Sequence, residues 1–195
     1  MNLFNLRFTL KKVDHKQNQN LLFNIIVPLF NAEQYIEKCL KSILKQSYKR
    51  FQVQVVDDCS SDSSYEIASS ICGVNKNFKI FKNSRRIGAL NNISNLLDTK
   101  IKEPSRTVDL IIDGDDYLYS GDVLNIVKEK YLETNCLITY GSHISSKGIQ
   151  GKKYPRLIRE FNLFRKYFWY GSHLRTFRHD LWLAINPQDL LNINK

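Results

Sequence analysis

Long hydrophobic runs are missing from this sequence of 195 residues. A membrane-spanning helix needs about 18 consecutive apolar residues, and no stretch approaches that length. The amino terminus also lacks the basic segment followed by a sustained apolar stretch that a secretion signal requires. We therefore predict a cytoplasmic protein without a transmembrane segment, whose contact with a membrane, if it makes one, is peripheral.

Cysteine pairs are missing as well. Cys39, Cys59, Cys72 and Cys136 are well separated, form no CxxC pair and have no His at zinc-finger spacing. These absences argue against a thiolate metal site and against a disulfide framework. We expect four reduced thiols that pack as small apolar side chains.

Positive charge is abundant, with 29 Lys and Arg against 19 Asp and Glu, a formal net charge of +10. This excess favours an anionic partner, which could be a nucleotide, a nucleic acid or a membrane surface, and charge alone does not choose among them. Hydrophobic residues at 43% and charged residues at 25% are typical of a globular protein, and the length fits one domain.

Short apolar segments alternate with helical patterns over most of the chain. Strands are predicted at residues 21–30, 51–57, 77–81, 108–112 and 136–140, and helices after residue 31 and over 63–73, 88–98 and 122–133. Asn31 and Gln34 have the spacing of a reciprocal helix cap, so the first helix is expected to begin there. The alternation predicts an α/β fold with a mixed or parallel sheet and helices on both faces.

Carboxylates gather where two of these strands end. The segment VDLIIDGDDYL places Asp113, Asp115 and Asp116 after the fourth strand, and Asp57 and Asp58 close the second. Ligands of open α/β sheets lie beyond the carboxyl ends of strands, so these side chains are expected to share one rim. Crowded carboxylates repel one another, and a divalent cation, Mg²⁺ or Mn²⁺, bound together with substrate phosphates would relieve the repulsion. The alternative is an ordinary Asp- and Gly-rich turn.

The stretch IIVPLFNAEQYIEKCLKSILKQSYKRFQVQVVDDCSSDSSYEIA resembles the amino-terminal half of the family 2 glycosyltransferases. The shared features are a strand ending in Pro-x-Phe-Asn, the helix end SILKQSY and the motif VDDCSSD, and IIDGDDYL falls where that family carries its metal-binding DxD. The ordered motifs extend from Asn24 to Tyr140. The resemblance implies a single Rossmann-like domain of the glycosyltransferase A type, with a mixed, mostly parallel sheet flanked by helices.

Site residues follow from the resemblance, position by position. The implied donor-binding residues are Pro28, Phe30, Asn31, Glu33, Asp58, Arg86, Asp113, Gly114 and Asp115, and the implied metal ligands are Asp115 and Asp116. The resemblance does not distinguish Asp115 from Asp116 as the metal ligand. Glu33 could equally be an acid favoured by the helix dipole, and Arg86 part of a solvated basic turn.

The implied activity is metal-dependent transfer of a sugar from a UDP-sugar to an acceptor hydroxyl, with inversion. The acceptor could be a glycan, a protein or a lipid. Inversion needs a general base, which this family carries on a helix well after the DxD motif. Asp180 and Asp189 are weak candidates, so the catalytic residue is left unassigned, and we expect either a fragment of a longer enzyme or a base placed elsewhere.

The chain is accordingly divided into an extension at 1–20, a nucleotide-sugar-binding domain at 21–141, and an incomplete, partly helical acceptor-side region at 142–195. One alternative is a degenerate nucleotide-sugar-binding domain that transfers nothing. Another is a basic nucleic-acid-binding module, suggested by the Arg, Lys and aromatic residues over 152–178. Because that module leaves the aspartates unexplained, no nucleic-acid partner is expected.

Overall fold

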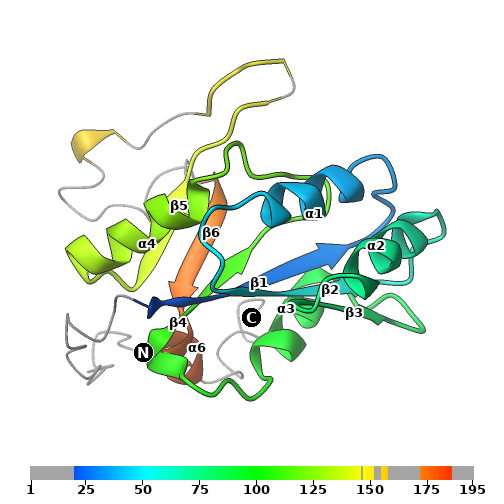
Figure 1. Cartoon of the computed structure of the whole chain (residues 1–195), viewed down its shortest axis with the longest axis horizontal. Helices are drawn as coiled ribbons and strands as arrows, with labels where there is room; N and C mark the ends of the chain where they lie inside the picture. The colour runs from blue at the N-terminus through cyan, green and yellow to red at the C-terminus, as the bar shows by residue number, and fades with distance from the viewer. Residues whose placement is uncertain (1–19, 146, 152–154, 158–171, 186–195) are drawn as a thin grey trace, which may run out of the picture.

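The computed structural model describes residues 20–145, 147–151, 155–157 and 172–185, which form one α/β domain (Figure 1). The strands are β1 (Leu22–Leu29), β2 (Phe51–Asp57), β3 (Phe78–Lys82), β4 (Thr107–Ile111), β5 (Ile138–Gly141) and β6 (Ser172–Arg178). The helices are α1 (Ile36–Leu44), α2 (Ser64–Gly73), α3 (Ala89–Leu97), α4 (Val123–Thr134) and α6 (His179–Leu183), with a 3-10 turn η3 (Pro104–Arg106). None of the described helices is both long and apolar enough to cross a membrane.

The six strands form one mixed sheet in the order β3-β2-β1-β4-β6-β5. The four strands from β3 to β4 are parallel, and β6 runs antiparallel to both β4 and β5. The prediction of a mixed, mostly parallel sheet flanked by helices is therefore confirmed. The carboxyl ends of β1, β2 and β4 meet at one edge, which positions the loops described below.

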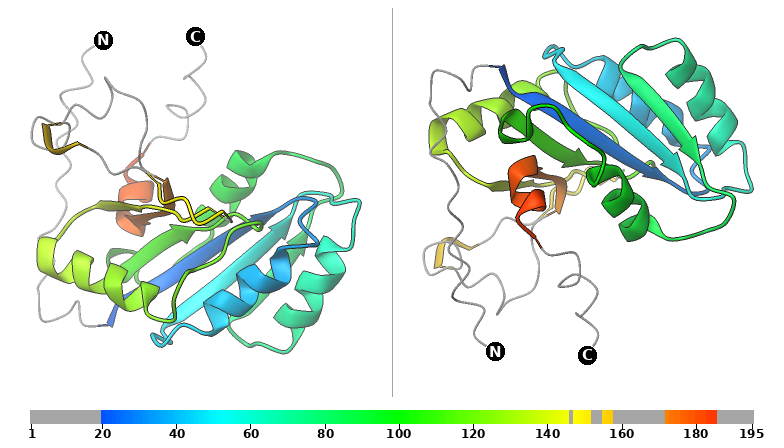
Figure 2. Two further views of the ribbon diagram at one scale, coloured as in Figure 1. Left: turned by 90° about the horizontal axis from the view of Figure 1, so that it is seen from above. Right: turned by 90° about the horizontal axis from the view of Figure 1, so that it is seen from below.

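Helices cover both faces of the sheet. Figure 2 shows α1, α2 and α4 on one face and α3 and α6 on the other. Side chains of β1 are buried in both layers: Ile25 in the larger core beneath α1, and Ile26 in a smaller one with Leu96 and Leu97 of α3. The continuous apolar run of β1 follows from this burial on both faces.

A buried polar network anchors the carboxyl-terminal segment to the sheet. Asp109, in β4, is fully buried; its Oδ1 accepts a hydrogen bond from Asn24 Nδ2 at 2.7 Å, and its Oδ2 lies 2.8 Å from Nδ1 of His179, also buried, in α6. On the opposite face, Thr176 Oγ1 of β6 lies 2.8 Å from Tyr131 Oη and 2.7 Å from Thr139 Oγ1. These bonds satisfy polar groups that would otherwise be costly to bury.

The strand β6 was not predicted from the sequence. The segment was expected to belong to a partly helical region beyond residue 141, but β6 lies inside the sheet between β4 and β5. The other five strands fall within two residues of their predicted ends. The sheet therefore extends past the predicted boundary at residue 141.

The predicted helix cap at Asn31 is wrong. The helix α1 begins only at Ile36, and Asn31 has a positive φ of 46°. Its side chain instead accepts a hydrogen bond from Ser61 N at 2.9 Å, and its own N–H donates to Ser60 Oγ at 3.0 Å. Asn31 thus joins the loop after β1 to the loop after β2.

All four cysteines are free thiols. Cys39 and Cys72 are buried, as the sequence predicted, and Cys136 is half-buried. Cys59 is exposed and has a positive φ of 66°, so the prediction of a packed thiol fails there. Its position in the turn after β2 explains the exposure.

Candidate donor-binding site

A cavity of about 260 Å³ lies at the carboxyl edge of the sheet. The loops after β1, β2 and β4 form its walls, together with the segment that leads into α3. Of the nine residues predicted to bind the donor, eight line the cavity: Pro28, Phe30, Asn31, Asp58, Arg86, Asp113, Gly114 and Asp115. Residues separated by up to 87 positions in the chain thus meet around one space.

Glu33, the ninth residue, lies outside this cavity. Its Oε2 accepts a hydrogen bond from Ser63 N at 3.0 Å, and its own N–H donates to Asp62 Oδ2 at 3.2 Å. Ala32 N donates to Ser64 Oγ at 2.7 Å in the same region. Together with Asn31, these contacts fasten the loop after β1 to the start of α2. The geometry gives Glu33 a structural part in holding the two loops together.

Asp58 is held rigidly at the back of the cavity. Its Oδ1 accepts hydrogen bonds from Asn83 Nδ2 and Ile87 N, both at 2.9 Å, and its Oδ2 accepts one from Gly88 N at 2.8 Å. Burial opposes ionisation of this carboxyl, but the hydrogen bonds from Ile87 N, Asn83 Nδ2 and Gly88 N outweigh it and lower its pKa to about 2. Asp58 is therefore a fixed anion at neutral pH.

Gly114 allows the loop after β4 to approach β1 closely. Its N–H donates to Pro28 O at 3.1 Å, which continues the pairing of β4 with β1 beyond the end of the strand. A Cβ at this position would lie 3.0 Å from Leu29 Cδ1 and 3.2 Å from Pro28 O. A side chain at this position would therefore require Leu29 or the acidic loop to shift.

Phe30 and Arg86 close one side of the cavity. The guanidinium carbon of Arg86 lies 3.9 Å from the centroid of the Phe30 ring. Such stacking of a guanidinium on an aromatic face is favourable. Arg85, the residue before it, does not line the cavity.

The five strand-end carboxylates do not all share the cavity. Asp58, Asp113 and Asp115 line it, whereas Asp57 is fully buried and its Oδ2 accepts a hydrogen bond from Ser60 N at 3.1 Å. Asp116 lines a different cavity of about 340 Å³, together with His143 and Leu174. Adjacent residues in the DGDD segment thus face two separate spaces.

The carboxylates present can hold a divalent cation only in part. Within the described ranges no group of three or more His, Cys, Asp or Glu side chains is arranged around a common metal position. Mg²⁺ and Mn²⁺ are commonly bound by one or two carboxylates and completed by water and substrate phosphates. Asp115, which is exposed at the cavity, and the neighbouring Asp113 fit this open arrangement.

The strand β6 brings a cation to the same carboxylates. Arg175 Nη2 lies 3.7 Å from Asp113 Oδ2, and both side chains are partly exposed. Asp180, at the far end of this segment, pairs with Arg178 instead. Because β6 is antiparallel to β4, with Arg178 opposite Val108 and Arg175 opposite Ile111, Asp180 lies near the amino end of β4, away from the cavity. Asp189 and the side chain of His173 lie outside the described residues.

Sequence reasoning missed several residues of the cavity. Its remaining lining residues are Leu29, Ala32, Tyr35, Ala89 and Asn92. Asn92 Oδ1 also accepts a hydrogen bond from Asn83 Nδ2 at 2.7 Å, so both amides support Asp58. The sequence signal that could have located Asn83 and Asn92 is the segment NSRRIGALNNIS, Asn83 to Ser94, which resembles the family's N-x-G-x-x-x-A-R-N region only loosely.

A model of glycosyl transferase family 2 matches residues 24–188. The chain belongs to this family. Among curated relatives, glycosyltransferase GlyA of Streptococcus pneumoniae serotype 4 is 28% identical over 134 residues, which is 69% of this chain and 18% of GlyA. The poly(ribitol-phosphate) beta-N-acetylglucosaminyltransferase TarS of Staphylococcus aureus is 30% identical over 140 residues, 69% of this chain and 22% of TarS. The chain thus spans about a fifth of the length of these two relatives.

Solved structures show the same fold. The crystal structure of S. aureus TarS residues 1–349 in complex with UDP has a TM-score of 0.65 at 24% identity, covering 89% of this chain and 52% of that one. The mannosyltransferase PcManGT from Pyrobaculum calidifontis, in complex with GDP-Man and Mn²⁺, has a TM-score of 0.59 at 20% identity, covering 83% and 45%. At these identities the likeness establishes the architecture of the family 2 domain.

Proposed function

We propose that this family 2 domain binds a UDP-sugar with a divalent cation and transfers the sugar, with inversion, to an acceptor hydroxyl. The observation that carries the proposal is the single cavity lined by Asp58, Asp113, Asp115 and Arg86 at the carboxyl edge of the sheet. It combines fixed acceptors for hydroxyl and ring N–H groups with a cation for a diphosphate. TarS, solved with UDP and with UDP-GlcNAc, supports the choice of donor.

Different residues around the cavity would contact different parts of the donor. Asp58, ionised and held by backbone N–H groups, would accept hydrogen bonds from the base or the ribose. The Phe30 ring offers a flat surface, and Arg86 above it supplies positive charge for phosphate oxygens. The loop around Gly114, which lies against β1, would run alongside the ribose and the first phosphate.

Mn²⁺ or Mg²⁺ would be held by Asp115, with Asp113 beside it. A cation there would stabilise the negative charge that develops on the departing diphosphate. Asp115 and Asp113 would in turn fix the diphosphate in one orientation. Asp116, which lines the second cavity, is not needed as a ligand in this arrangement. The complex of PcManGT with Mn²⁺ supports a divalent cation in this fold.

The acceptor and the general base lie outside the residues that carry the proposal. Among the described residues, the carboxylates that line the cavity are Asp58, Asp113 and Asp115, and each already has a part in the proposed binding of the nucleotide or the metal. We infer that the base comes from residues outside the described ranges. A degenerate donor-binding domain without transfer activity is the second candidate, and the same observation favours it.

Calorimetric titration with UDP, with and without Mn²⁺, tests the proposal. We expect saturable binding that is stronger with Mn²⁺, and loss of that metal dependence in Asp115→Asn. Absence of binding under both conditions would exclude the transferase and the degenerate domain together. Turnover of a panel of UDP-sugars then separates these two, since only the transferase consumes donor when an acceptor is supplied.

A further inference from the structure

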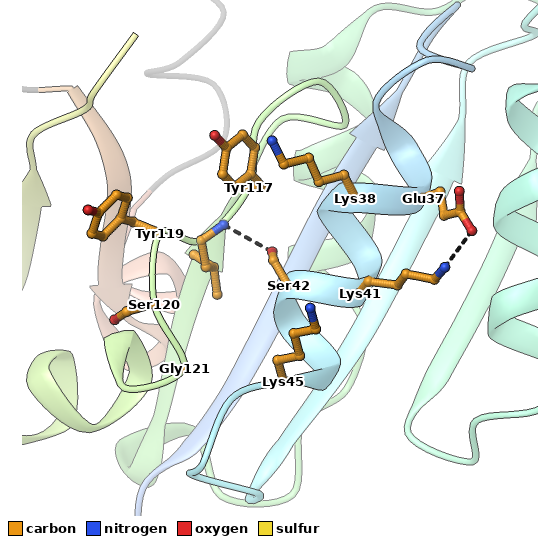
Figure 3. Close-up of a pocket in the computed structure, with 10 residues that line it drawn as sticks. Glu37, Lys38, Lys41, Ser42, Lys45, Tyr117, Tyr119, Ser120 and Gly121 are labelled. Atoms are coloured by element: carbon orange, nitrogen blue, oxygen red, sulfur yellow. Dashed lines mark hydrogen bonds and ion pairs between the residues drawn. The ribbon is translucent and has the colours of Figure 1, made fainter. Parts of the chain in front are cut away.

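A second groove lies between α1 and the loop that follows the acidic segment. Its volume is about 390 Å³, and Figure 3 shows the side chains that line it. We call it the basic groove and define it by Glu37, Lys38, Lys41, Ser42 and Lys45 of α1 and its carboxyl end and by residues 117–121 of the loop. Nothing in the proposed donor site uses these residues.

The walls of the basic groove are fastened to each other. Leu118 N donates a hydrogen bond to Ser42 Oγ at 3.0 Å, and Gln46 Nε2 donates to Ser120 O at 2.6 Å. Ser47 N donates to Gly121 O at 2.8 Å. These contacts hold the loop against the carboxyl end of α1 and the residues that follow it, where Gln46 is fully buried, so the groove is preformed.

Three lysines and one carboxylate line the groove along α1, and Lys41 points toward the carboxylate, Glu37 (Figure 3). Lys38, Lys41 and Lys45 recur at the three- and four-residue spacing that places side chains on one side of a helix. Glu37 accepts a hydrogen bond from Lys41 Nζ at 2.6 Å, so the Glu37 carboxylate already has a cationic partner. Within the described part of the chain, neither Lys38 nor Lys45 has an ion-pair partner.

Aromatic rings stand beside these charges. Lys38 Nζ lies 3.6 Å from the centroid of the Tyr117 ring, which holds the ammonium at the mouth of the groove. Tyr119, also in the lining, is 79% exposed, so one of its faces is open to a ligand. An ordinary solvated lysine face has neither a hollow nor aromatic walls. Together, the two kinds of side chain suit a ligand in which anionic groups alternate with a polyol or sugar.

The groove begins beside the donor cavity and leads away from it. Tyr35 lines the donor cavity and Lys38, three residues later, lines the groove. On the loop side, Asp115 lines the cavity and Tyr117, two residues later, lines the groove. From Lys38 to Lys45 the helix rises about 10 Å. A ligand lying in the groove would therefore present one end to the place where the donor sugar is expected.

We propose that the basic groove binds phosphate groups of the acceptor substrate, and that the acceptor is a phosphate-bearing sugar or polyol chain. This inference rests on the proposed function. Lysine ammonium groups bind phosphate as point charges and tolerate a mobile chain. The groove thus selects the acceptor by its phosphate groups.

The test measures binding of a short synthetic glycerol-phosphate oligomer to the whole chain saturated with UDP and Mn²⁺, so that the oligomer does not occupy the donor cavity. A neutral oligosaccharide of similar length is the reference ligand. We expect the oligomer to bind and the neutral chain not to, with affinity that falls as salt is added. In Lys38→Gln/Lys45→Gln the affinity should fall about tenfold, while UDP binding stays unchanged.

Two further variants guard against indirect effects. Lys45→Gln alone leaves the Lys38–Tyr117 contact intact and should still weaken oligomer binding by several-fold. Lys76→Gln/Lys79→Gln removes the same charge near the opposite edge of the sheet, at exposed positions, and should leave oligomer affinity unchanged. An equal loss in this control would assign the effect to net charge and overturn the inference.

The remaining outcomes also decide the matter. Retained UDP binding without oligomer binding overturns this inference and leaves the proposed function standing, whereas absence of UDP binding in the unaltered chain removes both. Vesicles of phosphatidylglycerol in phosphatidylcholine form a separate arm. Lysine-dependent binding to these vesicles without binding of the oligomer would assign the groove to a membrane surface and overturn the acceptor proposal.

Discussion

Arg175 Nη2, in β6, lies 3.7 Å from Asp113 Oδ2, in the loop after β4. A strand that comes more than 60 residues later in the chain thus supplies a positive charge to a carboxylate of the candidate donor site. The pair is partly exposed, so its contribution to stability is small. Arg175 and a divalent cation would compete for Asp113, because both are attracted to its carboxylate.

Arg175→Gln should therefore strengthen binding of Mn²⁺ in the absence of UDP. The Asp113 carboxylate no longer shares its charge with the guanidinium, and we expect an increase in affinity of up to about fivefold. Titration of Mn²⁺ followed by electron paramagnetic resonance measures it. Lys79→Gln, with the same charge change far from the cavity, is the control. Weaker Mn²⁺ binding in Arg175→Gln would contradict the prediction.

Asp115→Asn and Asp116→Asn should differ, although the two residues are adjacent. Asp115 lines the donor cavity and Asp116 lines the neighbouring one. We expect Asp115→Asn to reduce Mn²⁺-dependent UDP affinity by at least about tenfold, which is typical for loss of a charge-assisted contact, and Asp116→Asn to change it little. Calorimetry with UDP and Mn²⁺ compares them. Equal losses would show that both carboxylates act on the metal.

Asp58→Asn should lower stability in a pH-dependent way. Hydrogen bonds to the Asp58 carboxylate lower its pKa from 3.8 to about 2, so its contribution is fully present above pH 3.8 and is lost as the pH falls through about 2. At neutral pH we expect a loss of about 1 to 2 kcal/mol in the free energy of unfolding. Urea denaturation of both forms between neutral pH and pH 2 measures the difference. A difference that stayed constant down to pH 2 would rule out this origin.

Gly114→Ala should disturb the donor site more than the fold. The added Cβ meets Leu29 Cδ1 and Pro28 O at 3.0 and 3.2 Å, so either the Leu29 side chain or the acidic loop must shift. Overpacking of this kind costs about 1 to 3 kcal/mol, and UDP affinity should fall with it. Gly73→Ala is the matched control, because nothing lies within 4 Å of its Cβ position and its backbone needs no positive φ. Unfolding and UDP titrations on both variants test the comparison.

His179→Phe should destabilise the protein strongly. It leaves Asp109 Oδ2 buried without the His179 Nδ1 contact, and a buried polar group left without its hydrogen-bond partner costs about 1 to 3 kcal/mol, or more when it is charged. In Asp109→Leu/His179→Phe, the loss should be smaller than the sum of the two single losses. A double-mutant cycle by urea unfolding gives the coupling. Additive losses would mean that the two side chains act independently.

Most strands were predictable because a buried strand has a recognisable local composition. The run LFNIIVPL is almost continuously apolar, as expected for a parallel strand that is covered on both faces. The segment SHLRTFR could not be recognised in the same way, because Thr176 and Arg178 are buried polar residues. Thr176 depends on Tyr131 and Thr139, which are distant in sequence, and no local pattern contains those partners.

The location of the candidate site was predictable, but the direction of each side chain was not. Strand ends place Asp57 and Asp58 at the rim, yet only Asp58 lines the cavity, because Ser60 N holds the Asp57 carboxylate inside the turn. The Glu33 carboxylate likewise accepts a hydrogen bond from a loop backbone group, Ser63 N. These outcomes depend on backbone N–H groups of neighbouring loops, whose positions follow from the folded loops rather than from residue types.

The place of β6 in the sheet also constrains how the protein is made. The strand β5 pairs only with β6 among the described strands, and β6 covers the edge of β4. During synthesis the ribosome releases β1 to β5 well before residue 178, so the growing chain carries an open β4 edge until its last described strand arrives. The interval between β5 and β6 is thus the period when a nascent chain is most exposed to pairing with the wrong neighbour.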